Sequence, residues 1–189
     1  MKTGTYIYLI FFIILTSCGS NDAREPLFAE EDNSAGLFFS EYVEGSSFNK
    51  ALEIVNLTGS SINLTAEGYS IKKQANGNGD WVGELMLTGS IANNQVYVVA
   101  NENSTLPDIF NKASLLKAGS PMDFNGNDAI GLFKDGILLD IIGTLDDPDD
   151  FAKDVTLRRR LEVTEPTAIY DPNEWDLYEI DNVEDLGSY

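Results

Sequence analysis

The stretch Phe38–Asn56, FFSEYVEGSSFNKALEIVN, decides what kind of fold the sequence predicts. It contains two apolar runs, Phe38–Val43 and Ala51–Val55, separated by the small polar loop Glu44–Lys50. Each run is too short and alternates too strongly for an amphipathic helix. We therefore expect a strand, a loop and a second strand in this stretch.

One carboxylate interrupts each of these runs, where an uncharged residue would be easier to accommodate. Two such acids on paired strands could serve a glycosidase, which works with a pair of carboxyl groups. We favour ion pairs with three consecutive arginines near the C-terminus, because bidentate arginine–carboxylate bonding suits a partly buried site. The residues of these predicted structural ion pairs are Glu41, Glu53, Arg158, Arg159 and Arg160.

Further along the chain, short apolar runs alternate with turns rich in Gly, Asn and Asp. Asp135-Gly136 between two apolar runs is the strongest hairpin signal, because a type I′ turn needs positive φ at both positions. We expect one short helix in Thr105–Leu116, capped by Thr105, and turn-rich links at Leu57–Leu64 and Thr88–Asn94. Many short strands favour a sandwich over βαβ layering. The later strands are expected at Gly68–Gln74, Trp81–Leu87, Gln95–Ala100, Ala129–Phe133, Ile137–Ile142 and Lys153–Leu161.

The composition limits the chemistry that the chain can perform. Its 189 residues are 43% apolar, which is enough for the core of one main domain. The net charge of −19 repels phosphate backbones, so we expect no direct nucleic-acid binding. The sequence contains no histidine, which excludes Ser-His-Asp and Cys-His catalysis and His-ligated zinc. With one cysteine, no disulfide can form within a chain.

Residues 1–17 have the pattern of a signal peptide, with Lys2 followed by the apolar run Tyr6–Leu15. Leu15-Thr16-Ser17-Cys18-Gly19 matches a bacterial lipobox, which implies cleavage before Cys18 and acylation of its thiol and amine. More than one acyl chain gives stable membrane anchoring. The alternative is an ordinary signal peptide or anchor helix with an incidental cysteine. Residues 18–36 are polar and acidic and are expected to form a flexible tether.

The two strands of the opening stretch also begin an ordered series of short motifs, of which none is specific alone. The motifs are Ser40-Glu41, Glu53-Ile54-Val55-Asn56, Gly68-Tyr69-Ser70-Ile71, Asn76-Gly77 before Trp81, Leu87-Thr88-Gly89, Val96–Ala100, Asn127–Leu132, Asp135-Gly136, Asp140–Gly143, Asp154–Arg159, Glu174-Trp175 and Leu186-Gly187. In order and spacing, the series resembles the lamin tail domain in the form found on secreted bacterial proteins. The resemblance covers about Leu37–Gly143, and the trailer of the bacterial form covers residues 144–189.

The resemblance implies an all-β, immunoglobulin-like β-sandwich over residues 37–189, with one short helix and the C-terminal trailer as an extension. It implies no catalytic residues, because the family has no agreed active site. Bacterial members often accompany secreted nucleases or phosphatases, but we expect no catalytic domain alongside this one. We therefore expect a non-enzymatic, lipid-anchored binding or adhesion module. The alternatives are an accessory or docking subunit of a separate secreted nuclease- or phosphatase-type hydrolase and, third, a carboxylate- or metal-dependent hydrolase.

The expected location is the bacterial cell envelope, as an outer-membrane lipoprotein that is periplasmic or surface-exposed. The membrane is a partner through the lipid anchor, and the sequence leaves a protein or glycan partner open. The only cofactor considered is calcium, which prefers oxygen ligands. The densest acidic loop offers Asp146, Asp147, Asp149 and Asp150, although a solvated turn explains these residues equally well.

Two further loops carry oxygen ligands at alternate positions, and neither fits an EF-hand, because each lacks the Gly at position six and the Glu at position twelve. We interpret both as turns, which Asn, Asp and Gly commonly make. The ligands in question are Asn76, Asn78, Asp80 in one loop and Asp123, Asn125, Asn127 in the other. Of the two tryptophans, Trp175 is expected to be a core anchor, while Trp81 is either a core residue or an exposed binding aromatic.

Overall fold

The computed structural model describes Met1 and residues 36–189, so the predicted signal peptide, Cys18 and nearly all of the predicted tether lie outside the described residues. The strands are β1 (Leu37–Glu44), β2 (Lys50–Asn56), β3 (Ile62–Asn63), β4 (Tyr69–Gln74), β5 (Val82–Met86), β6 (Ser90–Ile91), β7 (Gln95–Asn101), β8 (Leu115–Lys117), β9 (Ala129–Lys134), β10 (Ile137–Ile142), β11 (Val155–Arg159) and β12 (Trp175–Glu179). The helical elements are α1 (Pro107–Lys112) and the 3-10 turns η1 (Ala75–Gly77) and η2 (Pro172–Glu174).

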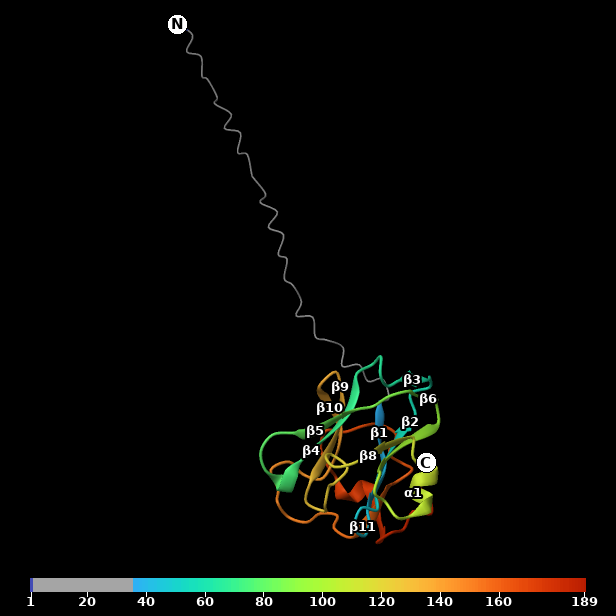
Figure 1. Ribbon diagram of the computed structural model, residues 1–189. Helices are drawn as coiled ribbons and strands as arrows, with labels where there is room; N and C mark the ends of the chain where they lie inside the picture. Colours follow the sequence, from blue (N-terminus) through green and yellow to red (C-terminus); the bar gives the residue numbers. More distant parts are fainter. Residues whose placement is uncertain (2–35) are drawn as a thin grey trace. The chain divides into compact units, whose positions relative to one another are not determined.

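These strands build the predicted immunoglobulin-like β-sandwich (Figure 1). One sheet has the order β12-β11-β1-β2-β7-β8 and the other β10-β9-β4-β5, while β3 and β6 form a separate ribbon. The main core lies between the two sheets and contains side chains such as Tyr42, Ile54, Ile71 and Leu132. The prediction of an all-β sandwich is confirmed.

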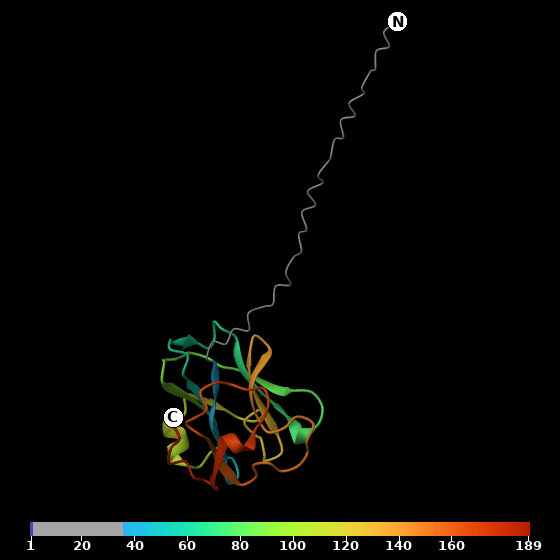
Figure 2. The same cartoon turned by 180° about the vertical axis from the view of Figure 1, so that it is seen from behind.

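Strands β1 and β2 lie in the middle of the larger sheet, and every residue of both is buried. One face packs on the main core through Leu52 and Ile54. The other face carries Val43 and Ala51 into a second apolar cluster, to which α1 contributes Ile109. Figures 1 and 2 show α1 beside the C-terminus on this side. Both faces are therefore covered, which explains why the opening stretch is so apolar.

The hairpin of β9 and β10 has the predicted two-residue turn, in which Asp135 has φ 49° and Gly136 has φ 80°. The links that we interpreted as turns each contain a short strand, because Ile62 of β3 pairs with Ile91 of β6. This ribbon uses only two residues from each link. Its pairing is between distant parts of the chain, so local sequence could not reveal it.

The predicted helix is real but shorter than Thr105–Leu116, and the predicted cap is wrong. Leu106 is the N-cap residue and makes no side-chain cap bond, while the Thr105 hydroxyl donates to Asn49 Oδ1 at 3.2 Å. Leu115 belongs to β8, which pairs in parallel with β7. Strand pairing therefore ends the helix early. Within the described residues, no helix combines the length and apolar character needed to cross a membrane.

The C-terminal trailer belongs to the sandwich, because two of its strands extend the larger sheet. β11 pairs antiparallel with β1, with Leu157 opposite Tyr42, and β12 pairs antiparallel with β11. Both residues of that first pair contribute to the main core. The folded unit therefore continues through residues 144–189.

Candidate functional site

The two predicted carboxylates form a pair on the outer face of the larger sheet. Glu41 of β1 lies directly opposite Glu53 of β2, and both are almost completely buried. A register shift between Phe39 and Glu41 places Ser40 in a bulge, from which its hydroxyl donates to Glu53 Oε1 at 2.8 Å. Such a bulge re-aims side chains locally. Here the bulge lets Ser40 supply the hydrogen bond to Glu53 Oε1.

Burial decides the protonation of this pair. It raises the pKa of Glu41 to about 8, against the opposing effect of the Arg158 charge and with a further rise from the Glu53 charge. Burial also raises the pKa of Glu53 to about 7, against the hydrogen bonds from Ser40 and from the Gly187 amide. Because burial penalises the charged form of an acid, both groups take up protons in the neutral range.

The last ten residues of the chain, which we call the C-terminal segment (residues 180–189), cover the carboxylate pair. The amide of Gly187 donates to Glu53 Oε2 at 2.5 Å. Leu186 is fully buried in the second apolar cluster, and its carbonyl accepts from Lys112 of α1. The ring of Tyr189 packs edge-on against Phe38 with 5.6 Å between centroids. The segment therefore covers Glu53, while Glu41, although buried, lines a surface hollow.

Among the three arginines, Arg158 is the one that faces this pair. Its Nε lies 3.5 Å from Glu41 Oε1, although neither atom has a hydrogen-bond partner among the described residues. The same guanidinium lies 3.4 Å from Asp185 Oδ2 and stacks over the ring of Tyr178 at 4.2 Å. Arg158 thus links β1 to the C-terminal segment.

The other predicted ion-pair partners differ from what we expected. Among the described residues, Glu53 has no arginine partner, and its oxygens accept from Ser40 and from the C-terminal segment. Arg159 points into the sandwich, where its Nη1 lies 3.1 Å from both carboxylate oxygens of Asp140. Arg160 points outward and pairs with Asp176 at 2.9 Å. Alternation along β11 sends neighbouring arginines to opposite faces, so they cannot share one pair of acids.

Asp140 is a buried site residue that sequence reasoning missed. It lies in β10 of the smaller sheet and accepts from the Phe39 amide at 2.8 Å and from the Thr167 amide at 2.9 Å. Together with its two bonds from Arg159, these contacts join both sheets and the loop before η2. The available signal was an acid inside the apolar run of β10, the same kind of signal that identified Glu41.

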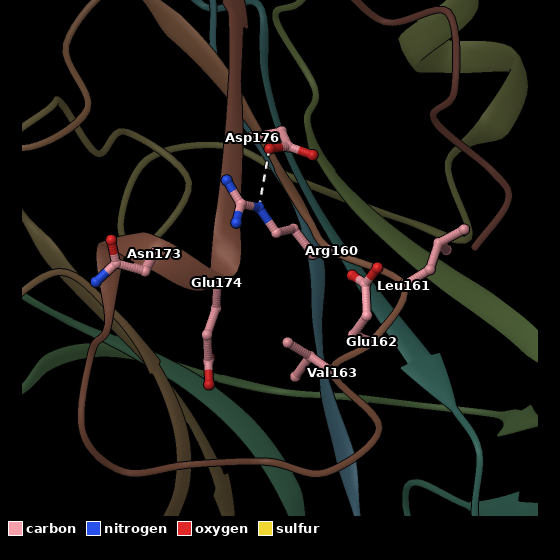
Figure 3. Close-up of a pocket in the computed structure, with 7 residues that line it drawn as sticks. All are labelled: Arg160, Leu161, Glu162, Val163, Asn173, Glu174 and Asp176. Carbon is pink, nitrogen blue, oxygen red and sulfur yellow. Dashed lines mark hydrogen bonds and ion pairs between the residues drawn. The ribbon is translucent and has the colours of Figure 1, made fainter.

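Two surface hollows lie next to the arginines. One has a volume of about 420 Å³ and is lined by Glu41, Arg158, Tyr178 and Tyr189 among others. The second has a volume of about 680 Å³, and Figure 3 shows it between residues 160–163 and the side chains around η2. Both hollows share the exposed Arg160–Asp176 ion pair. The first is lined by Glu41 and all three arginines, and the second by Arg160 alone of the predicted site residues.

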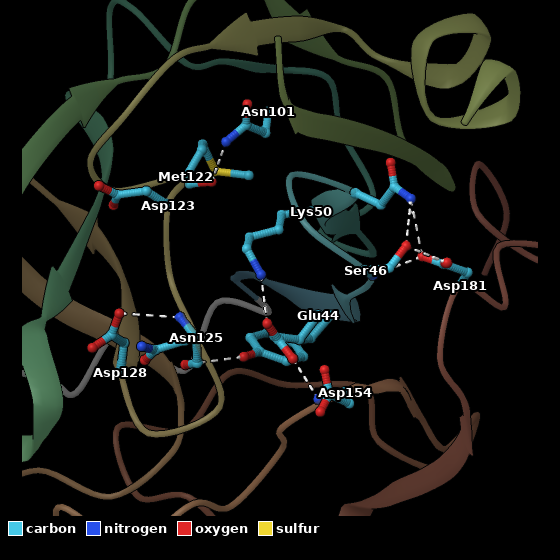
Figure 4. Close-up of polar contacts among 12 residues, drawn as sticks. Glu44, Ser46, Lys50, Asn101, Met122, Asp123, Asn125, Asp128, Asp154 and Asp181 are labelled. Carbon is cyan, nitrogen blue, oxygen red and sulfur yellow. Dashed lines mark hydrogen bonds and ion pairs between the residues drawn. The ribbon is translucent and has the colours of Figure 1, made fainter. Parts of the chain in front are cut away.

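The loops considered for calcium are held by bonds within the protein. Lys73 Nζ lies 2.9 Å from both Asp123 and Asp128, so an ammonium group occupies the space between these carboxylates. Asp128 also accepts from the amide of Asn125 (Figure 4) and from that of Asn76. Within residues 36–189, no three acidic or other metal-ligating side chains are grouped so as to hold a metal ion.

The acidic loop at residues 146–150 is likewise engaged in local contacts. Asp146 Oδ1 accepts from the Gln74 amide group at 2.9 Å, and Asp147 accepts from the Asp149 backbone at 3.0 Å. Asp150 lies 3.6 Å from Lys153. The loop has the hydrogen bonds of an acidic turn.

A second buried ion pair, which sequence reasoning also missed, stabilises the turn between β1 and β2. Lys50 Nζ lies 2.5 Å from Glu44 Oε1, and Glu44 also accepts from the backbone of Asp154. Asp181 accepts hydrogen bonds from Ser46 on the same turn (Figure 4). The turn is therefore tied to the trailer at two points.

The two tryptophans have different environments. Trp175 is buried in the main core, as predicted, and lies under the Arg159 guanidinium at 4.9 Å. Trp81 is partly exposed and packs edge-on against Phe133 with 5.0 Å between centroids. It also lies over Gly131, where a side chain would collide with its ring. Trp81 therefore covers the outer face of the smaller sheet.

Comparison with known proteins agrees with the fold. The family model described as Lamin Tail Domain matches residues 30–146, which is more than half of the chain. A search of curated proteins found no match. The family match ends before β11, so the pairing of the trailer with β1 comes from the structure alone.

Proposed function

The chain belongs to the lamin tail domain family, and we propose that it is a non-enzymatic, lipid-anchored binding or adhesion module of the bacterial cell envelope. Immunoglobulin-like lamin tail domains are often found in binding or structural modules. The lipobox around Cys18 supports the anchor, and the absence of histidine from the whole chain removes the commonest general base. The sandwich is then the binding body and the anchor holds it at the membrane.

The observation that carries the proposal is the burial of the carboxylate pair. Glu41 and Glu53 were the residues best placed to serve a hydrolase, but both are buried, Glu53 beneath the C-terminal segment through Gly187 and Glu41 beside Arg158. A catalytic acid must lie within hydrogen-bonding reach of the reacting group. The arrangement supports a structural role for the pair, in which it holds the end of the chain against the larger sheet.

The anchor is tested by labelling bacteria that express the chain with a radioactive fatty acid. Wild-type chain should take up the label, and Cys18→Ser should take up none and stay uncleaved or become soluble, because it lacks the sulfur atom that carries the lipid. Ser17→Ala is the matched control and should be labelled like wild type, since it keeps a small residue before the cysteine. A wild-type chain without label would contradict the anchor.

The absence of catalysis is tested with purified chain and generic phosphodiester, phosphomonoester and glycoside substrates. We expect no turnover above that of heat-denatured chain. Turnover that Glu53→Gln abolishes, with the circular dichroism spectrum unchanged, would instead establish a hydrolase. Turnover that appears only when a separate secreted nuclease or phosphatase binds the chain would assign the docking role.

A further inference from the structure

Strand β12 forms one edge of the larger sheet, and its outer side is open. Arg160 lies opposite Glu174 and its amide donates to the Glu174 carbonyl, so the hydrogen-bonded pairs of the antiparallel ladder inward from it are Arg158–Asp176 and Thr156–Tyr178. Asp176 therefore bonds to β11, whereas the amide and carbonyl of Leu177 and the amide of Glu179 point away from the sheet. Within residues 36–189, these three groups have no backbone or side-chain partner.

The edge has properties that natural proteins normally avoid. A row of unpaired amides and carbonyls can accept another strand, and exposed apolar residues make the addition more favourable. The side chain of Leu177 is 68% exposed, and Leu161 at the same end of the sheet is 72% exposed. The opposite edge, β8, is a three-residue strand and offers a shorter site.

Charge indicates what kind of strand can be added. Residues 161–189 contain nine Asp and Glu residues and no Lys or Arg. Asp176 and Glu179 lie on the edge strand itself and are both exposed. A second copy of the chain would bring the same negative charge to the edge and would be repelled, whereas a basic segment would be attracted.

The two hollows described above lie along this edge and can take side chains. Both are lined by Asp176 and by Arg160, whose ion pair is about half exposed on either side. The hollow of about 420 Å³ is also lined by Arg158 and Arg159, whereas that of about 680 Å³ is lined by Glu162 and Glu174 and therefore suits a basic side chain better. An exposed pair of this kind is weak, so a competing basic group can displace Arg160 from Asp176. In strand addition, backbone bonds give affinity and pockets for alternate side chains give specificity.

We propose that β12 is a docking edge for an extended basic segment of a partner protein, in which Lys or Arg residues alternate with apolar ones. The segment bonds to the open backbone groups of Leu177 and Glu179. Its basic side chains lie on the face of the sheet that carries Asp176, and its apolar side chains lie on the opposite face, which carries Leu177. The proposal deepens the binding function proposed above and rests on it, since it assigns the surface and the chemistry of the partner.

The test uses the full-length chain in a neutral detergent and an acetylated octapeptide of alternating Lys and Val. Hydrogen exchange should slow at the amides of Leu177 and Glu179 when this peptide is added, and an octapeptide of alternating Glu and Val should have no effect. Leu177→Pro should abolish the slowing, because proline removes the outward amide but not a bond to β11.

Charge variants give the affinity measurement. Asp176→Asn combined with Glu179→Gln should weaken binding of the Lys–Val peptide by roughly 3- to 30-fold in fluorescence anisotropy. Asp108→Asn combined with Glu102→Gln removes the same charge from exposed positions on α1 and beyond β7, and should leave the affinity within about twofold of wild type.

Three results would overturn the proposal. The first is unchanged hydrogen exchange at β12 when the Lys–Val peptide is added, and the second is equal binding of the Lys–Val and Glu–Val peptides. The third is a dimer in analytical ultracentrifugation that Leu177→Pro dissociates, because a second copy of the chain would then occupy the edge. The proposed function fails separately. If the chain takes up no fatty acid but still binds the Lys–Val peptide, the lipid anchor is refuted and the docking edge at β12 stands. If the chain is labelled with fatty acid but does not bind the peptide, the docking edge is refuted and the lipid anchor stands.

Discussion

The contact between Asp140 and Arg159 should be the most important ion pair for stability, and Asp140→Asn tests it. Both side chains are at most 1% exposed, and they join β10 of one sheet to β11 of the other. Asn keeps the size of the side chain but removes its charge. The Arg159 guanidinium then stays buried, and its remaining anionic partner is Glu174. The Arg159 Nη2–Glu174 Oε2 distance is 2.5 Å, and the side chain of Glu174 is 30% exposed.

The magnitude follows from burial. Breaking a buried ion pair by removing one partner costs roughly 3–5 kcal/mol, because the other charge stays buried without compensation. Because Glu174 remains, we expect the lower end, about 3 kcal/mol. For a chain of this size, 1 kcal/mol corresponds to a change in Tm of roughly 2–4 °C, so Tm should fall by roughly 6–12 °C.

The neighbouring pair supplies the matched control. Arg160 and Asp176 are 49% and 52% exposed, so Asp176→Asn should change the free energy of unfolding by at most about 1 kcal/mol. Thermal unfolding followed by circular dichroism, together with urea titration, measures both variants. The double variant Asp140→Leu with Arg159→Met should cost less than the two single changes added together. The reasoning would be refuted if Asp140→Asn and Asp176→Asn lowered the free energy of unfolding equally. It would also be refuted if the loss in the double variant equalled the sum of the losses in Asp140→Leu and Arg159→Met.

Three further predictions concern other parts of the sandwich. Burial raises the pKa of Glu41 from 4.5 to about 8 and that of Glu53 from 4.5 to about 7, so the folded chain binds more protons than the unfolded chain between about pH 4.5 and pH 8. The contribution of these protons to the free energy of unfolding is complete below about pH 4.5 and is lost as the pH rises to 8. The double variant Glu41→Gln with Glu53→Gln should therefore show a flatter decline of Tm with pH over this range, and an unchanged slope would contradict this. Gly77→Ala should lower Tm more than Gly59→Ala, because both have positive φ but only Gly77 abuts the backbone of the acidic loop; equal shifts would contradict it. Leu186→Ala should cost about 2–5 kcal/mol in urea titration, and a loss below about 1 kcal/mol would mean that the C-terminal segment is not packed as described.

The sequence was most informative where structure depends on neighbouring residues. Asp135-Gly136 specified its hairpin because positive φ at two adjacent positions is a local requirement. The helix was predicted too long because the local sequence does not show that Leu115 and Leu116 pair with β7. Thr105 was predicted as a cap for the same local reason, whereas its partner Asn49 is distant in the sequence. Tertiary pairing overrode local propensity in both places.

The candidate site could be predicted in kind but not in detail. Glu41 and Glu53 stood out because a charge inside an apolar strand needs a specific explanation. Neighbouring arginines on one strand point to opposite faces, but their spacing does not show which acid each arginine contacts. Asp140 is contacted by Arg159 across the gap between the sheets, and no sequence pattern links positions on different sheets.

The pairing of the trailer with β1 explains why acids and arginines are needed in this core at all. Without β11, the strand β1 would be an edge, and an edge with unpaired backbone groups invites other chains. Arg158 and Arg159 lie on the two faces of β11, Arg158 at 3.5 Å from Glu41 and Arg159 at 3.1 Å from Asp140, so correct docking of β11 places each arginine beside an acid. A shift of one residue would exchange the two faces and bury an arginine against apolar side chains. The buried charges therefore fix the register of the strand that moves the open edge from β1 to β12.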